Sequence, residues 1–351
     1  MNDDLLFSRG SEDTILSDQD LRDGLTQALD ALGPKTRVCA LPPDGTRAHA
    51  RAGILTSQLY DYYGSSLSCV IPALGTHRSM GQDEFERMFP GVPYSLHRAH
   101  EWRTGLTELG RVPKEFISEI SEGACSFDWP AQINRHIVEG GYELIVSIGQ
   151  VVPHEVVGMA NHSKNLFIGT GGIEAINRSH WLGAVCGIER IMGKLDTPVR
   201  AVLDYALKNF AQALPMLWVL TVVGPLADGT MVTRGLFIGT GRSCLEQAAK
   251  LSEAVNIQHL EKPIERALVW LDPSEYRSTW LGNKAIYRTR MAMADDGELI
   301  VLAPGLRQFG EDSGPHRTAA ESPRPPPRAV RPGGASFRLP RPASPTPSVW
   351  G

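Results

Sequence analysis

Residues 142–148 read YELIVSI, a nearly continuous apolar run that is followed directly by Gly149. Strands buried on both faces of a parallel sheet have this composition, whereas strands with one solvated face alternate apolar and polar residues. Two runs upstream have the same character, TRVCAL at residues 36–41 and SLSCVIPA at residues 66–73. The three runs therefore predict strands of a largely parallel sheet.

Segments with helical spacing separate these runs, and the first has a cap residue, Ser17 or Asp18, at its start and Gly33-Pro34 at its end. Alternating helices and strands are typical of α/β proteins. The helices are expected at residues 17–32, 51–64 and 83–89, and further strands at residues 216–223, 267–271 and 298–303.

The chain has 351 residues, too many for one comfortable core, and predicts two α/β domains with parallel-rich sheets and a cleft between them. We place a catalytic and cofactor-binding domain at residues 1–190 and a second α/β domain at residues 191–312. Residues 313–351 contain ten of the chain's 25 prolines and six arginines but one acidic residue, a composition that builds no packed core. They are predicted to be a disordered Pro/Arg-rich tail, although a lost reading frame would produce the same abrupt change.

Charge and cysteine content argue against several classes of protein. The net charge of −4 gives no electrostatic reason to expect nucleic acid or a membrane as partner. The N-terminus is acidic and no apolar run is long enough to span a bilayer, which predicts a cytoplasmic location. The cysteines are scattered without a CxxC pair, so we expect reduced core thiols rather than disulfides or a zinc ribbon. They are Cys39, Cys69, Cys125, Cys186 and Cys244.

Polar residues follow the predicted strands, where open α/β sheets bind their ligands. After the first strand, Asp44-Gly45-Thr46-Arg47 offers a guanidinium fork for a substrate carboxylate, although an Asp-Gly turn with a surface ion pair is the alternative. After the second, Gly75-Thr76-His77-Arg78 adds an imidazole suited to proton transfer near neutral pH. A solvated loop histidine is the alternative there.

The densest group of chemically active side chains follows the third strand. His154, His162, Lys164 and His180 lie within 27 positions, interleaved with glycines that allow close approach of the backbone. This pattern favours a metal or covalent-cofactor site. Imidazole suits nickel, zinc, copper and iron alike, so the spacing does not identify the metal.

Two glycine loops follow identical LFIGT runs. Gly169-Thr170-Gly171-Gly172 and Gly239-Thr240-Gly241 could bind a phosphate through backbone N–H groups. Neither matches the dinucleotide fingerprint or the P-loop, so simple tight turns are an equal alternative.

Taken together, these motifs resemble the nickel-pincer lactate racemase family. His154 is followed by Lys164 after ten residues and by His180 after 26, which are the intervals of that family. The resemblance covers roughly residues 35–312 and implies an isomerase, a racemase or epimerase of a 2-hydroxy acid, with an incomplete second domain and a truncated or altered C-terminus. The motifs that carry it are Asp44-Gly45-Thr46-Arg47, Leu74-Gly75-Thr76-His77-Arg78, Pro153-His154, Lys164 and His180.

The resemblance implies a role for each matching residue. Lys164 would carry the nickel-pincer nucleotide, a pyridinium-3,5-bisthiocarboxylic acid mononucleotide that holds nickel, and His180 would complete the square-planar nickel. His77 and His154 would act as alternate acid and base. The remaining implied contacts are Arg47, Asp44 and Lys284 with the substrate, and Thr76, Gly171 and Gly172 with the cofactor.

The implied mechanism couples proton transfer to hydride transfer. One histidine removes the hydroxyl proton while the hydride on C2 moves to the cofactor, and return from the other face inverts the centre. The implied partners are a small 2-hydroxy acid and, transiently, the enzymes that make the cofactor. Leu281 stands where lactate racemases carry a glutamine, which favours a bulkier or more apolar substrate than lactate.

Two alternatives remain open from the sequence. A zinc-dependent hydrolase would use His154, His162 and His180 around the metal, with Glu155 as base. A catalytically inactive racemase-like remnant would keep the cofactor site of the first domain without turnover.

Overall fold

The structure is a computed structural model that describes residues 4–309 and 335–338. The chain forms two compact units, Met1–Gln258 and His259–Gly351, which are described separately here. The first unit is built on a six-stranded sheet covered by helices, which confirms the predicted α/β class.

The central sheet of the first unit has the strand order β1-β10-β9-β6-β2-β3. β3, β2, β6 and β9 are mutually parallel, and β10 and β1 continue the sheet in antiparallel fashion. The YELIVSI run supplies β6, which lies inside the sheet and is buried along almost its whole length. The strand bounds are β1 Leu5–Gly10, β2 Val38–Leu41, β3 Leu67–Val70, β6 Leu144–Gln150, β9 Met216–Pro225 and β10 Met231–Gly239.

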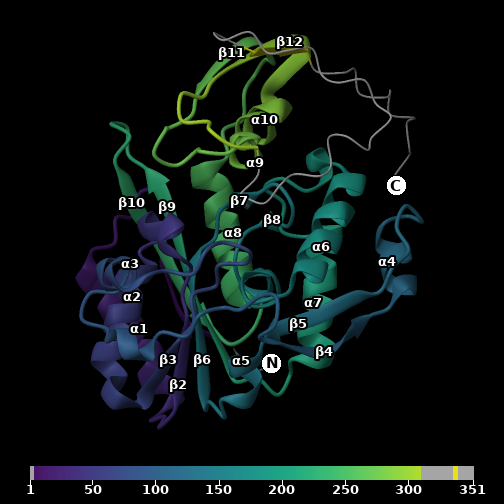
Figure 1. Ribbon diagram of the computed structural model, residues 1–351. Coiled ribbons are helices and arrows are strands. Elements are labelled where there is room, and N and C mark those ends of the chain that lie inside the picture. The colour runs from purple at the N-terminus through teal and green to yellow at the C-terminus, as the bar shows by residue number, and fades with distance from the viewer. Residues whose placement is uncertain (1–3, 310–334, 339–351) are drawn as a thin grey trace. The chain divides into compact units, whose positions relative to one another are not determined.

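Helices cover both faces of this sheet (Figure 1). Successive residues of β2 point to opposite faces, because Val38 and Ala40 belong to one buried cluster and Cys39 and Leu41 to the other. The first cluster contains α1 Asp18–Leu32, α2 Ala52–Tyr63 and α3 Gln82–Met88, and the second contains α4 Lys114–Ile120, α5 Arg135–Glu139, α6 Ile173–Cys186, α7 Pro198–Phe210 and α8 Ser243–Asn256. Two smaller sheets pair β4 Leu106–Val112 with β5 Trp129–Asn134, and β7 Pro153–His154 with β8 Gly158–Met159.

Local sequence signals set the start and the end of α1, as predicted. The Ser17 hydroxyl accepts the Asp20 backbone N–H at 3.1 Å, and the Asp20 carboxylate accepts the Ser17 N–H at 2.8 Å. This reciprocal pair satisfies two N–H groups that the first turn of a helix leaves open. Gly33 follows the last residue with a φ of 69°, a conformation that favours glycine.

The first unit extends to Gln258, which differs from the domain boundary predicted near residue 190. The physical reason is that β9 pairs with β6 and β10 pairs with β9, so the chain after residue 190 completes the first sheet instead of opening a second one. Apolar periodicity identifies β9 as a strand but carries no information about its neighbour.

The second unit contains a small three-stranded sheet in the order β11-β12-β13. β11 and β12 are parallel, and β13 is antiparallel to β12. Four residues of the tail predicted to be disordered therefore form a strand, and the rest of residues 313–351 lies outside the described residues. The elements are β11 Ile264–Trp270, α9 Thr279–Gly282, α10 Lys284–Thr289, β12 Met293–Leu302 and β13 Ala335–Arg338.

The core agrees with the predictions drawn from cysteine content. All five cysteines are buried with free thiols. Within the described ranges, no helix is both long and apolar enough to cross a membrane.

Candidate functional site

Asp44 and His77 meet beyond the carboxyl ends of two neighbouring strands. The two loops are joined directly, because Pro43 and Ala73 form a bridge between the segments that follow β2 and β3. His77 Nδ1 lies 2.7 Å from Asp44 Oδ2; the carboxylate side chain is 8% exposed and the imidazole 42% exposed. Since a carboxylate accepts, Nδ1 carries the hydrogen of this bond, and Nε2 is the lone-pair nitrogen of the neutral ring.

Gly75 anchors the His77 loop to the segment that carries Lys164. Its N–H donates to the Gly169 carbonyl at 2.8 Å, and its φ of 62° lies in the left-handed region that favours glycine. Thr76 lies between this anchor and His77 in the same loop. The contact brings together two predicted site segments that are about ninety residues apart in sequence.

His154 ends β7, the first strand of a hairpin that follows β6. The Val156 N–H donates to His154 Nδ1 at 3.1 Å, so the neutral ring carries its hydrogen on Nε2. The imidazole is 14% exposed, and Glu155 Oε2 lies 3.9 Å from its Nδ1. His77 and His154 are therefore held in opposite tautomers.

Lys164 stands at the start of a one-turn π-helix, Asn165–Gly169. Single π turns are rare and concentrate at functional sites. The Asn165 side-chain amide donates to the Leu41 carbonyl at 3.0 Å, at the carboxyl end of β2, and to the Ser147 hydroxyl at 2.8 Å, in the middle of the neighbouring strand β6. Lys164 is thereby fixed at the same sheet edge as Asp44.

His180 lies within α6, and burial lowers the pKa of its imidazole. Its Nδ1 lies 2.7 Å from the Ile176 carbonyl, which favours the protonated ring. The Lys164 ammonium lowers this pKa further and the Glu155 carboxylate raises it, so both groups are within electrostatic reach of the ring. The net result is a neutral imidazole with its lone pair on Nε2.

Gly171 and Gly172 precede α6, and their small size is required by packing. A Cβ at Gly171 would lie 1.8 Å from the Phe167 carbonyl oxygen, and one at Gly172 would lie 2.4 Å from Gln132 Oε1. The Gly171 carbonyl in turn accepts from His100 Nε2 at 3.0 Å. The structure thus assigns the glycines a close-packed turn, and a cofactor contact there stays a prediction.

The side chain of Asp4 packs against the second glycine loop, residues 239–241. Asp4 hydrogen-bonds to the Ser243 hydroxyl and, at 3.5 Å, to the Ser243 N–H, at the start of α8. Its backbone carbonyl accepts the Thr240 N–H at 2.8 Å. The loop at residues 239–241 is therefore a structural turn.

The two predicted substrate-binding cations occupy different units. Arg47 lies in the short helix Gly45–Ala50 beside Asp44, whose carbonyl accepts the Arg47 N–H at 3.1 Å. Lys284 begins α10 in the second unit. The structure thus brings Asp44, Arg47 and His77 into one local group and leaves the role of Lys284 a prediction.

The zinc site of the hydrolase alternative is not formed. His162 is 2% exposed, its ring centroid lies 4.2 Å from that of Trp218, and its Nε2 lies 3.2 Å from the Gly241 carbonyl. Across residues 4–309 and 335–338, no group of three or more His, Cys, Asp or Glu side chains is placed to hold a metal. The prediction that His154, His162 and His180 share a zinc ion is therefore wrong, because the ring of His162 packs into the core.

We expect His162 to make the fold acid-sensitive. Burial, reinforced by the Arg200 charge, lowers the pKa of His162 from 6.5 to about 3, so the unfolded chain binds a proton that the native chain does not. The unfolding free energy should fall as pH drops from 6.5 toward 3, by on the order of 1 kcal/mol per pH unit. Urea unfolding of the wild type between pH 7 and about pH 4 should show a steeper loss than His162→Gln shows.

The control is His136→Gln, which replaces an exposed histidine on α5. It should reproduce the pH dependence of the wild type. Equal slopes for the wild type and His162→Gln would contradict the assignment.

Sequence reasoning missed two buried residues that support this site. His100 holds the Gly171 carbonyl, and its Nδ1 lies 3.2 Å from the Asn134 side-chain amide. Arg200 lies among the buried residues of α7 and bonds to the segment before Lys164. The available signal was an arginine among the apolar positions of an amphipathic helix, because Arg200 lies between Val199 and Val202 among the buried residues of α7.

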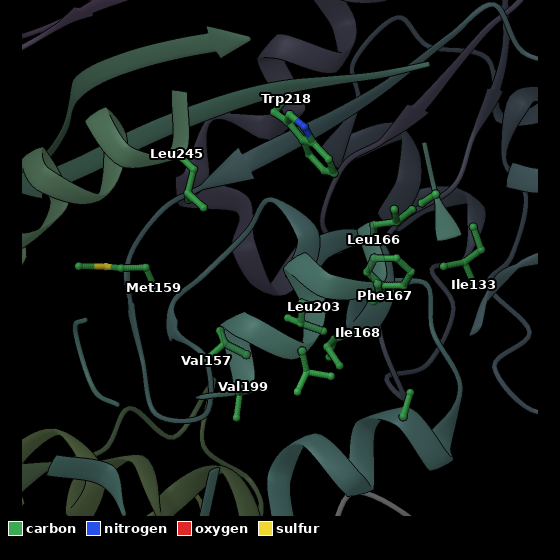
Figure 2. Close-up of a cluster of buried hydrophobic side chains, with 14 of the residues drawn as sticks. Ile133, Val157, Met159, Leu166, Phe167, Ile168, Val199, Leu203, Trp218 and Leu245 are labelled. Carbon is green, nitrogen blue, oxygen red and sulfur yellow. The ribbon is translucent and has the colours of Figure 1, made fainter. Parts of the chain in front are cut away.

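Figure 2 shows part of the hydrophobic cluster to which the residues after Lys164 belong. Leu166 and Phe167 of the π-helix belong to the same buried cluster as Leu203 of α7 and Trp218 of β9. The segment that follows Lys164 is thus packed into the core rather than lying on the surface.

Comparison with known proteins identifies the first part of the chain. No curated protein matches. Among solved structures, a Thermotoga maritima protein determined by the Northeast Structural Genomics Consortium matches with a TM-score of 0.73 and 24% identity over 83% of this chain and 71% of that chain. The lactate racemase apoprotein from Thermoanaerobacterium thermosaccharolyticum matches with a TM-score of 0.59 and 17% identity over 85% of this chain and 69% of that chain.

At sequence identities this low, the structural matches show a shared fold. The family model described as the lactate racemase N-terminal domain matches residues 24–190, the part that contains His77, His154, Lys164 and His180. This agrees with the resemblance seen in the motifs: residues 24–190 of the chain match the lactate racemase N-terminal domain family.

Proposed function

We propose that the chain is a racemase or epimerase of a 2-hydroxy acid that uses a nickel-pincer nucleotide attached to Lys164. The observation that carries the proposal is the bond from the Gly75 N–H to the Gly169 carbonyl, which joins the loop of His77 and Asp44 to the segment that begins at Lys164. An amine for attachment and a neutral imidazole for the metal are the two groups that such a cofactor requires from the protein.

The residues present fit this cofactor. Burial keeps His180 neutral, and the Nδ1 bond to Ile176 leaves Nε2 as the nitrogen that would ligate nickel. A metal whose other donors belong to its cofactor requires one protein ligand, which His180 would supply. When bound, the nickel-pincer nucleotide supplies a hydride acceptor and donor for C2 of the substrate.

The two loop histidines are suited to hold and move the substrate's hydroxyl proton. His77 presents a lone pair on Nε2 because Asp44 holds its Nδ1–H, and His154 presents Nε2–H because Val156 donates to its Nδ1. In these tautomers His77 can accept the hydroxyl proton at Nε2. His154 would accept the proton of the opposite enantiomer only after its ring takes the Nδ1–H tautomer and gives up the bond from Val156. Arg47, next to Asp44 in its loop, would bind the substrate carboxylate.

The direct test is a peptide map of the protein purified from a host that makes the cofactor. We expect the peptide containing Lys164 to carry the mass of a sulfur-containing pyridinium mononucleotide. An unmodified Lys164 from such a host would overturn the proposal. An adduct without turnover of any 2-hydroxy acid would instead identify the inactive racemase-like remnant.

A further inference from the structure

Arg200 is a buried guanidinium in the first turn of α7, with 1% of its surface exposed. Burial lowers its pKa to about 10, so it remains charged near neutral pH. A charge in the core is tolerated only when hydrogen bonds replace its water. Its acceptors are the carbonyls of Met159 and Asn161, the latter at 3.1 Å, and the Ser163 hydroxyl at 2.9 Å.

All three acceptors belong to the five residues immediately before Lys164. Asn161 and His162 have φ values of 70° and 58°, two successive non-glycine residues in the left-handed region. Such backbone persists only where surrounding contacts hold it. The Asn161 carbonyl accepts both Arg200 Nη1 and the Lys164 backbone N–H, the latter at 3.3 Å, so one oxygen links the guanidinium to the residue that presents the amine.

Further hydrogen bonds connect the segment before Lys164 to α7. The Ser163 hydroxyl, which accepts from Arg200, donates to Asp204 Oδ1 at 2.7 Å. The Thr197 hydroxyl at the start of α7 donates to the Val157 carbonyl at 3.2 Å. Residues 157, 159, 161 and 163 are therefore each bonded to α7, and Arg200 makes three of these contacts.

We infer that Arg200 is a positioning residue, which fixes the left-handed turn at Asn161-His162 and thereby the direction of the Lys164 amine. The identity of the group attached to the Lys164 amine rests on the proposed function, whereas the positioning of the amine by Arg200 does not. Removing the guanidinium deprives the Met159 carbonyl and the Ser163 hydroxyl of this donor and leaves the Asn161 carbonyl with the Lys164 N–H alone.

The test compares Arg200→Gln and Arg200→Lys with a matched control, Arg234→Gln. Arg234 is also a buried arginine that donates to two backbone carbonyls, those of Thr14 and Pro225, and it lies on β10. In the protein without cofactor, amide hydrogen exchange should be faster by about tenfold or more at residues 162–165 in Arg200→Gln. Arg200→Lys should give a smaller increase, and Arg234→Gln should leave exchange at these residues at the wild-type rate.

A second measurement distinguishes positioning from general loss of stability. Acylation of Lys164 by an amine-selective reagent, followed by mass spectrometry with Lys250 as internal reference, should change several-fold in Arg200→Gln and not in Arg234→Gln. In cofactor-loaded protein, Arg200→Lys should lower kcat and leave KM for the substrate near its wild-type value. If Arg200→Gln does not fold, Arg200→Lys and Ser163→Ala carry the same test.

Equal exchange and labelling in the Arg200 and Arg234 variants would overturn the inference. An unmodified Lys164 in the wild type, together with faster exchange in Arg200→Gln, would overturn the proposed function and leave the positioning role standing.

Discussion

Lys164→Ala is expected to abolish both the mass increment on its peptide and all racemisation of 2-hydroxy acids, in protein made by a host that synthesises the cofactor. In the proposed function the amine is the group through which the cofactor is held, so its loss would remove the hydride-transferring group from the site altogether. We expect kcat to fall by at least about 10⁴-fold, the scale observed when a group that acts directly in the chemistry is removed. Chiral chromatography of the product measures the rate.

Two further variants make this result specific. Lys164→Arg keeps the positive charge but lacks the amine, so it should be as inactive as Lys164→Ala. Lys250→Ala removes an exposed lysine on α8 and should retain wild-type activity and adduct. A Lys164→Arg variant with more than a few per cent of wild-type turnover would show that Lys164 contributes charge alone, and attachment through its amine would have to be abandoned.

The parts of the fold that the sequence predicts are those determined by short stretches of chain. The Ser17 cap and Gly33 end specify α1 locally, and the apolar run at residues 142–148 places β6 inside a parallel sheet. The pairing of β9 with β6 depends on contacts between residues about seventy positions apart, which no local pattern encodes. That is why the predicted boundary near residue 190 falls inside the first unit.

The candidate site divides in the same way. Because polar loops follow two predicted parallel strands, the sequence predicts that Asp44 and His77 lie at one sheet edge. In the structure, His77 Nδ1 lies 2.7 Å from Asp44 Oδ2. The tautomer of His154 depends on the backbone of its own hairpin, and the support for Lys164 comes from Arg200, a residue 36 positions later. Spacing within a motif selects the residues that perform chemistry but not the buried groups that orient them.

His77→Gln and His154→Gln are each expected to lower kcat/KM for racemisation by about 10²- to 10⁴-fold, the usual contribution of a positioned acid or base. Glutamine is close in size to histidine and keeps hydrogen-bonding capacity, so the effect reports loss of proton transfer more than loss of packing. For a racemase, the two directions must be slowed equally in either variant, because the equilibrium constant between enantiomers is one. Initial rates from each enantiomer measure this.

The separate roles of the two histidines become visible only in the half-reaction. If each ring serves one enantiomer, His77→Gln should still convert one enantiomer to the bound 2-keto acid in a single turnover, and His154→Gln should convert the other. Acid quenching and trapping of the keto acid as a hydrazone measures the yield, with His136→Gln as a control that should convert both. Loss of the same enantiomer's half-reaction in both variants would contradict the assignment of one histidine to each enantiomer.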